Sequence, residues 1–168
     1  FAYSDQNNLT NASRFCDYVV HQLKRYGVKT AQMTCQTDNG SEYIGSVNKR
    51  AGRLSLFEKT LKHYEITHGR IPPRASYLQG DVETFNRIVE AEFFDVESFG
   101  NEDEFLGKIY AYQLFFNFLR KNRYRDNQSP VMILKERFPD MNSDILNLPP
   151  IRLDKQDDKW MIDYKPWG

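Results

Sequence analysis

The chain has 168 residues, of which 40% are hydrophobic, so it can bury one sizeable core without disulfides. Its 23 basic and 23 acidic residues give a formal net charge of zero, which lacks the basic excess typical of nucleic-acid-binding proteins. No apolar run approaches the ~18 residues of a membrane-spanning helix and no signal peptide is visible, which excludes a transmembrane helix and favours a cytoplasmic protein.

The predicted elements begin with the end of a strand at residues 1–4, followed by an amphipathic helix that stops near Gly27. The helical spacing is carried by four side chains: Phe15, Val19, Leu23 and Tyr26. Residues 28–37 then alternate in character and predict a strand, which ends at the turn sequence 38–40. Asp38 is therefore expected at the tip of a strand.

A helix and a short strand are predicted before the next acidic motif. The helix is indicated by an apolar stripe: Leu54, Phe57, Leu61 and Tyr64. Residues 65–71 predict the strand, and Pro72-Pro73 then forces an extended loop. A further helix is expected from Gly80, with one apolar and one polar face. The apolar face carries Val82, Phe85, Val89 and Val96, and the polar face carries Glu83, Arg87 and Glu90.

Two more helices and a tail complete the prediction. Asn101 begins a capping-box-like sequence, followed by a long apolar stripe of Phe105, Ile109, Tyr112, Phe116 and Leu119. Ser129-Pro130 has the residue types of a helix start. We expect one domain over residues 1–139 and a tail or linker over residues 140–168, because the C-terminal segment is polar and acidic.

The carboxylates of Asp38 and Glu83 lie on elements that suit a divalent metal site. Cleavage or transfer of a phosphodiester needs an activated hydroxyl and stabilised charge on the phosphate, and two metal ions roughly 4 Å apart supply both. Magnesium prefers carboxylate oxygens and keeps several waters, so a few acids on rigid elements are sufficient. A strand tip and a helix face are elements of this kind.

Two stretches of the sequence resemble the signatures of a known superfamily. Thr37 to Glu42 reads Thr-Asp-Asn-Gly-Ser-Glu, and Gln79 to Arg87 follows the pattern Gly-x-Val-Glu-x-x-Asn-Arg. In order and residue type they are similar to the integrase and transposase catalytic core, whose three acidic residues hold divalent metal. Further similar segments are Ile66-Thr67-His68 and Asn127-Gln128-Ser129-Pro130. The likeness covers most of residues 1–139 and is greatest to the bacterial insertion-sequence transposases.

The resemblance implies an α/β fold, in which an RNase H-like mixed sheet is flanked by helices. It also implies that Asp38 and Glu83 are catalytic residues that hold Mg²⁺ or Mn²⁺. Arg87 would contact substrate phosphate or orient the Glu83 carboxylate, and Asn39 would shape the turn beside the metal. The implied substrate is DNA rather than a small molecule, and the implied reactions are DNA cleavage and strand transfer.

The family's first aspartate lies on an opening strand, and this sequence has only about ten residues before its first long helix. We therefore expect the chain to lack the first strands of the sheet and the first metal ligand, and to be inactive on its own. Asp5 is assigned a turn or capping role. Exposed strand edges would favour a homo-oligomer.

Basic, thiol and imidazole side chains add smaller expectations. Arg123 and Arg125 flank an aromatic residue near a helix end and are predicted to contact a DNA backbone. Cys16 and Cys35 have no metal-ligand spacing and are expected to be free thiols. The three histidines show no zinc-ligand grouping, although the resemblance makes His68 a candidate neighbour of the active site.

Two other functions remain open at this point. The zero net charge and the missing first acid favour a non-catalytic module over a catalytic core, either for DNA binding or for assembly, such as the product of a decayed mobile element. An RNase H-like nuclease that only hydrolyses nucleic acid would use the same two carboxylates. Cleavage and joining assays distinguish these functions from strand transfer.

Overall fold

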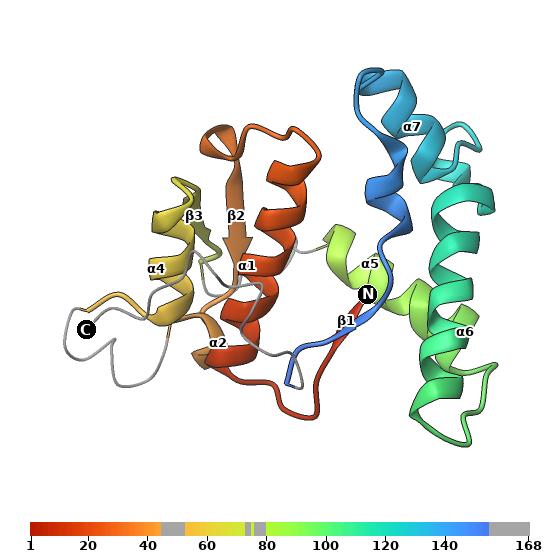
Figure 1. Ribbon diagram of the computed structural model, residues 1–168, viewed down its shortest axis with the longest axis horizontal. Helices are drawn as coiled ribbons and strands as arrows, with labels where there is room; N and C mark the ends of the chain where they lie inside the picture. The colour runs from red at the N-terminus through yellow and green to blue at the C-terminus, as the bar shows by residue number, and fades with distance from the viewer. Residues whose placement is uncertain (45–52, 73–74, 76–79, 155–168) are drawn as a thin grey trace. The chain divides into compact units, whose positions relative to one another are not determined.

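The computed structural model describes residues 1–44, 53–72, 75 and 80–154, which contain helices and short parallel strands (Figure 1). The fold is therefore of the mixed α/β class, as the sequence predicted. The chain divides into two compact units. The strand unit comprises Ala2–Arg74 and Ile151–Gly168, and the helical unit comprises Phe1 and Ala75–Pro150.

The strand unit contains two parallel pairs of strands. Its elements are β1 (Ala2–Tyr3), α1 (Leu9–Arg25), η1 (Thr30–Gln32), β2 (Thr34–Thr37), α2 (Ser41–Ile44), α4 (Leu56–His63), β3 (Thr67–Arg70) and β4 (Ile151–Arg152). Strand β1 pairs with β4 and strand β2 pairs with β3, in a register that places Cys35 opposite His68. The β2–β3 connection runs through α4, since parallel strands need a crossover. Helices α1 and α4 pack together (Figure 1). Cys35 of β2 packs against the core cluster to which both helices contribute.

Helix α1 begins after Asn8 and ends near Gly27, and its end is where the sequence predicted it. The Asn8 side chain accepts a hydrogen bond from the Asn11 amide at 2.9 Å and caps the first turn. At the other end, Gly27 adopts a φ of 86°, a left-handed conformation that glycine reaches without steric cost. The Gly27 amide donates to the Lys24 carbonyl and the Val28 amide donates to the Leu23 carbonyl, which closes the helix.

The buried face of α1 is rotated from the predicted stripe. Cys16 and Val20 are buried in the core, together with Phe57 and Leu61 of α4, whereas Phe15 is 45% exposed. Three polar side chains of α1 are also buried, and each has a hydrogen-bond partner. The Asn11 amide group donates to the Gln6 carbonyl, the Ser13 hydroxyl donates to the Leu9 carbonyl, and the Asp17 carboxylate accepts from the Tyr64 hydroxyl.

The predicted strand over residues 28–37 is shorter than expected. Only Thr34–Thr37 form β2, because β3 offers just four partner residues, and Thr30–Gln32 form a 3₁₀ turn instead. The Thr30 hydroxyl is buried in this turn and donates to the Tyr64 carbonyl. The alternating pattern is preserved within β2, where Thr37 is buried and Gln36 is exposed.

The helical unit is built around a cluster of aromatic and aliphatic side chains. Its elements are α5 (Gly80–Val89), the π-helical turn η3 (Glu90–Phe94), α6 (Glu102–Leu114), the π-helical turn η4 (Phe115–Leu119), the 3₁₀ turn η5 (Arg123–Arg125), α7 (Pro130–Arg137) and the 3₁₀ turn η6 (Ser143–Asn147). Val89, Phe93, Ile109 and Tyr112 form the buried cluster. Asn101 caps α6 as expected, because its side chain accepts from the Glu104 amide at 2.9 Å. The capping box is not closed, since the Glu104 carboxylate accepts from the Gly100 amide and not from that of Asn101.

The predicted apolar face of the helix from Gly80 is only partly buried. Val89 is in the core, but Val82 is 61% exposed and Val96 is 71% exposed. Val96 lies beyond Phe94, where the helical segment ends, so the predicted apolar face does not extend to it. Phe93, four residues after Val89, is buried within the π-helical turn η3.

Residues 140–154, expected to belong to a tail or linker, contain η6 and β4 and pack against other elements. The Gln113 side chain donates to the Leu148 carbonyl at 2.6 Å, and the Asn117 side chain donates to the Leu146 carbonyl at 2.8 Å. Leu153 is buried in the strand unit and its amide donates to the Tyr3 carbonyl. The remainder of the predicted tail, residues 155–168, lies outside the described residues. Within the described ranges, no helix has both the length and the apolar character needed to cross a membrane.

Candidate functional site

Asp38 lies at the carboxyl end of β2, where the chain turns into α2. Thr37 is buried, whereas Asp38 is exposed. The Asp38 Oδ1 accepts a hydrogen bond from the Gly40 amide at 2.8 Å, which closes a turn of the Asx type. Among the described residues, the other carboxylate oxygen has no hydrogen-bond partner. The turn therefore holds the Asp38 side chain in place and leaves one oxygen for a ligand.

Asn39 ties this turn to the neighbouring strand. Its Nδ2 donates to the Ile71 carbonyl at 2.9 Å, and the Ile71 amide donates to the Thr37 carbonyl at 2.8 Å. These bonds continue the parallel pairing of β2 and β3 beyond their last residues. The amide group of Asn39 is therefore used inside the strand unit, where it positions the backbone that carries Asp38.

His68 of β3 contacts the residue that precedes Asp38. Its Nε2 lies 2.9 Å from the Thr37 hydroxyl oxygen, and that hydroxyl lies 3.0 Å from the Asp38 carbonyl oxygen. Because the hydroxyl has one proton and donates it to the carbonyl, the arrangement fits the tautomer in which His68 Nε2–H donates to Thr37. Burial, together with the positive charge of Arg70, lowers the pKa of His68 against the opposing effect of Glu58. The ring is therefore neutral at pH 7.

Glu58 of α4 is a buried carboxylate with two kinds of partner. Its Oε2 accepts from the Ser55 amide at 2.7 Å, and its Oε1 forms an ion pair with Arg70. Burial alone would raise the pKa of Glu58, but the Ser55 amide and the Arg70 guanidinium outweigh it and hold that pKa below its ordinary value. Glu58 therefore stays charged and fixes Arg70 at the end of β3.

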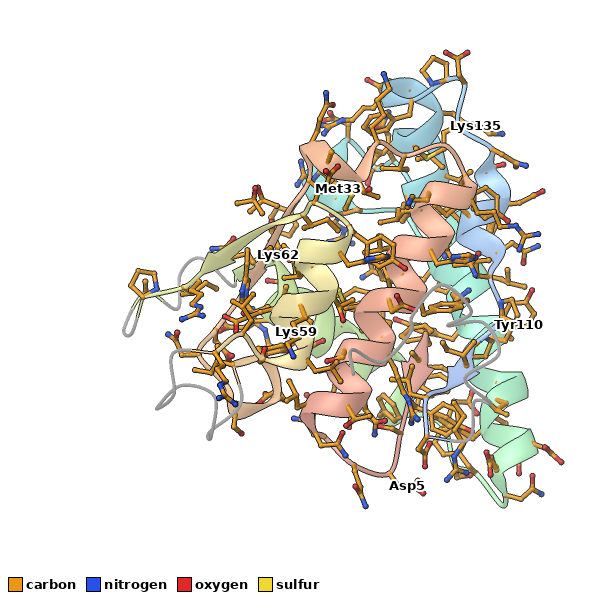
Figure 2. All side chains as sticks on the ribbon, turned by 60° about the vertical axis from the view of Figure 1, so that its left-hand side comes forward. Asp5, Met33, Lys59, Lys62, Tyr110 and Lys135 are labelled. Atoms are coloured by element: carbon orange, nitrogen blue, oxygen red, sulfur yellow. The ribbon has the colours of Figure 1, made fainter. Side chains whose placement is uncertain are left out.

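A hollow of about 350 Å³ opens beside this network in the strand unit. Leu61 and Ile66 supply apolar lining, and Glu58, His68 and Arg70 supply polar groups. Lys62, labelled in Figure 2, also lines the hollow from α4. The charges are of both signs, so the hollow does not select a purely anionic or cationic ligand.

Glu83 and Arg87 lie one turn apart on α5 in the helical unit. Both side chains are exposed, and neither forms a hydrogen bond or ion pair with another described residue. Residues at i and i+4 share a helix face, so the carboxylate and the guanidinium are presented together. Glu83 also lies in the first turn of α5, where the helix dipole stabilises a negative charge.

Arg123 and Arg125, the other predicted DNA contacts, lie on η5 and are exposed. Neither side chain forms a hydrogen bond or ion pair within the described ranges. Arg120 differs, because it makes three hydrogen bonds to the Glu92 carboxylate, at 2.9, 2.7 and 2.6 Å, and stacks over Phe116. Arg120 is therefore a structural residue, whereas Arg123 and Arg125 are exposed.

The described residues do not contain a closed metal site. Across residues 1–44, 53–72, 75 and 80–154, no three His, Cys, Asp or Glu side chains converge on a point that could hold a metal ion. Asp38 belongs to the strand unit and Glu83 to the helical unit. Comparison of the chain with protein-family models, with curated proteins and with solved structures finds no match in any of the three.

The sequence alone did not reveal the Glu58 network. A signal was present in Ser55-x-x-Glu58, a capping box in which each side chain binds the other residue's amide. The partnership of Glu58 with Arg70 has no such signal, because it depends on how α4 packs beside β3. His68 was expected near the site, and the structure places its ring against Thr37.

Proposed function

We propose that the chain is part of a DNA integrase or transposase catalytic core, in which Asp38 and Glu83 are two of the acidic residues that hold Mg²⁺ or Mn²⁺. The observation that carries the proposal is the position of the Thr37 to Glu42 motif. Asp38 follows the last residue of a parallel strand, is exposed, and is held by its own Asx turn. In open α/β sheets, ligands bind at the carboxyl ends of the strands.

The donor atoms fit a hard divalent cation. Asp38 retains one carboxylate oxygen without a partner among the described residues, and Glu83 retains both. Oxygen donors on a strand end and on a helix are the kind that magnesium and manganese prefer. A bound ion of this class would activate a water or a DNA hydroxyl and stabilise charge on the phosphate. Arg87, on the Glu83 face of α5, would contact the phosphate.

The proposed fold is RNase H-like, and two observations support it. The β2–α4–β3 crossover is a parallel unit of the sort found in such sheets. The order of the two motifs along the chain supplies the second support. The proposal further includes a homo-oligomer, a DNA substrate and a location in the cytoplasm, where bacterial DNA is accessible.

A first experiment measures metal binding directly on the chain. We expect Mn²⁺ to broaden the amide NMR signals of Gly40 and of the first turn of α5, because a paramagnetic ion relaxes nearby protons. Asp38→Asn and Glu83→Gln should each remove the broadening in their own segment. Asp81→Asn is the matched control, since it removes a charge from the same helical turn. Broadening that survives both substitutions would contradict the assignment.

A second experiment measures chemistry with the full-length protein and its terminal DNA repeats. Asp38→Asn or Glu83→Gln should abolish strand transfer and leave DNA binding intact. Wild-type protein that cleaves DNA but never joins it would indicate an RNase H-like nuclease. Unchanged strand transfer in both variants would refute the proposal.

A second candidate function is a non-catalytic DNA-binding or assembly module. It is favoured by the zero net charge and by the lack of a three-ligand cluster among the described residues. The same assays decide between the two candidates. DNA binding without any cleaved or joined product, in the presence of Mg²⁺ and of Mn²⁺, would support this second function.

A further inference from the structure

The loop from Asn122 to Gln128 in the helical unit is closed by its own backbone. The Asn122 amide donates to the Gln128 carbonyl at 3.1 Å, and the Asn127 amide donates back to the Asn122 carbonyl at 3.0 Å. Two further bonds lie inside the loop, from the Arg125 amide to the Asn122 carbonyl and from the Gln128 amide to the Arg125 carbonyl. The loop conformation is therefore fixed without help from the side chains at its tip.

Side chains of the loop's flanks complete this framework. The Asn122 Oδ1 accepts from the Tyr124 amide at 3.0 Å. Asp126 and Asn127 have φ values of 51° and 57°, in the left-handed region that Asp and Asn tolerate better than most residues. The Gln128 side chain donates to Glu136 of α7 at 2.6 Å, which anchors the loop to the next helix.

The tip of the loop carries one aromatic residue between two arginines in the sequence. Tyr124 is 96% exposed, so its ring contributes almost nothing to packing. Successive residues of a 3₁₀ turn project about 120° apart, so Arg123 and Arg125 leave the backbone in directions different from that of Tyr124. Neither arginine has an ion-pair partner within the described ranges, whereas nearby Arg120 is committed to Glu92.

We propose that this loop binds single-stranded DNA, with the Tyr124 ring stacked on an unpaired base and with Arg123 and Arg125 on the flanking phosphates. Every base offers a π face to an aromatic ring, and guanidinium groups complement phosphate oxygens in charge and shape. A base inside an intact duplex is already stacked on its neighbours, so an exposed ring gains little from it. The inference rests on the proposed function only for the choice of DNA as the nucleic acid.

The preorganised backbone of the loop favours ligand binding. A loop that is ordered before binding loses less conformational freedom when the ligand arrives. Stacking of one base on one aromatic ring should change affinity about 5- to 150-fold. Each arginine that neutralises a phosphate of a single strand should add about 0.7 to the slope of log affinity against log salt.

The test measures fluorescence anisotropy of a labelled 12-mer oligothymidine and of a blunt duplex of the same length, with the full chain. Tyr124→Ala should weaken single-strand binding about 5- to 150-fold at an unchanged salt slope, and Tyr124→Phe should retain the affinity. Arg123→Gln with Arg125→Gln should lower the salt slope by about 1.4. Phe138→Ala and Lys121→Gln are matched controls for an exposed aromatic and an exposed charge, and neither should reproduce these effects.

An abasic nucleotide provides the sharper readout. An oligonucleotide with abasic positions should bind the wild type more weakly, and Tyr124→Ala should cause no additional loss with it. If the affinity of Tyr124→Ala for the single strand is within twofold of the wild-type affinity, the inference about the loop is refuted. The proposed function would remain intact in that case if the protein still binds the duplex. Wild-type protein that binds neither DNA form would refute both. Equal loss with duplex and single strand would show a structural effect and would also overturn the inference.

Discussion

Substitution of Ser55 by alanine should loosen the start of α4 more than an ordinary cap substitution does. Ser55 is 0% exposed and is the N-cap of α4. Its hydroxyl oxygen accepts from the Glu58 amide at 3.1 Å, and its hydroxyl proton goes to the Tyr43 carbonyl at 2.5 Å. Alanine removes both bonds, so the buried Glu58 amide and the partly buried Tyr43 carbonyl lose these partners.

The expected cost follows from these contacts. Loss of a cap costs about 1 kcal/mol. Loss of the second hydrogen bond, which leaves the Tyr43 carbonyl without its Ser55 partner, raises the total to about 2–3 kcal/mol. Asn101→Ala is the matched control, because Asn101 caps α6 through one bond to the Glu104 amide on an exposed surface. That substitution should cost about 1 kcal/mol. The difference between the losses in Ser55→Ala and Asn101→Ala measures the effect of burial and of the second hydrogen bond.

Hydrogen–deuterium exchange measures the two helices separately, so it suits a chain with two compact units. Protection of the α4 amides should fall about 30- to 150-fold in Ser55→Ala, and protection of the α6 amides should fall about fivefold in Asn101→Ala. Ser55→Thr keeps a hydroxyl and should retain more of the protection than alanine does. A loss in Ser55→Ala no larger than that in Asn101→Ala would refute the reasoning.

Two further predictions concern titrating groups. Burial, and then the nearby Cys35 and Asp17, raise the pKa of the Cys16 thiol to about 12, so alkylation by iodoacetamide at pH 8 should be about 1,000-fold slower than for a free thiol; rapid labelling of the native protein, read by mass spectrometry, would contradict this. The Arg120 hydrogen bonds hold the pKa of Glu92 below 4.5, so the pair stabilises the fold above that pH and loses its contribution as pH falls through the lower, folded pKa. Arg120→Met should remove about 0.5–1 kcal/mol at pH 7 and almost nothing at pH 2, since both groups are partly exposed; equal losses at both pH values in urea titrations would exclude the ion pair as the cause.

Local signals in the sequence located the starts of two helices, α6 and α7. Asn101 and the Ser129-Pro130 pair are encoded within a few residues of the helices they begin, so α6 and α7 could be predicted. The hydroxyl of Ser129 nevertheless makes no capping bond in the described structure, and the proline alone suits the first helical position. Proline at N1 and serine at the cap are separate signals that need not act together.

Other parts of the fold depended on contacts between distant residues. Asp17 is buried in α1 because the Tyr64 hydroxyl reaches it from a position 47 residues away, which no local pattern reveals. The limited length of β2 has a similar origin, since it matches the four residues of β3. Periodicity finds apolar faces, but it cannot find a polar side chain whose partner comes from another element.

Part of the candidate site could likewise be predicted from local sequence, and part depended on contacts between distant residues. The residue types at 38–40 favour a turn and so predict Asp38 at a strand end, and the structure has Asp38 there. The hydrogen-bonded ion pair between Arg120 and Glu92, 28 residues apart, could not be predicted from the sequence, in which Arg120 lies close to Arg123 and Arg125. Charge clusters along the chain thus overestimate how many cations are available to a ligand.

The π-helical turn at Glu90–Phe94 is the last part of the helical segment that begins at Gly80. The α-helical part before the turn presents Glu83 and Arg87, and the turn itself buries Phe93. Each residue of an α-helix advances the direction of the side chains by about 100°. Deletion of one residue from this turn would therefore rotate the exposed acid and base relative to the buried anchor, although every side chain would still be present. Chain length in this segment is thus as informative as residue identity when other sequences are aligned with this one.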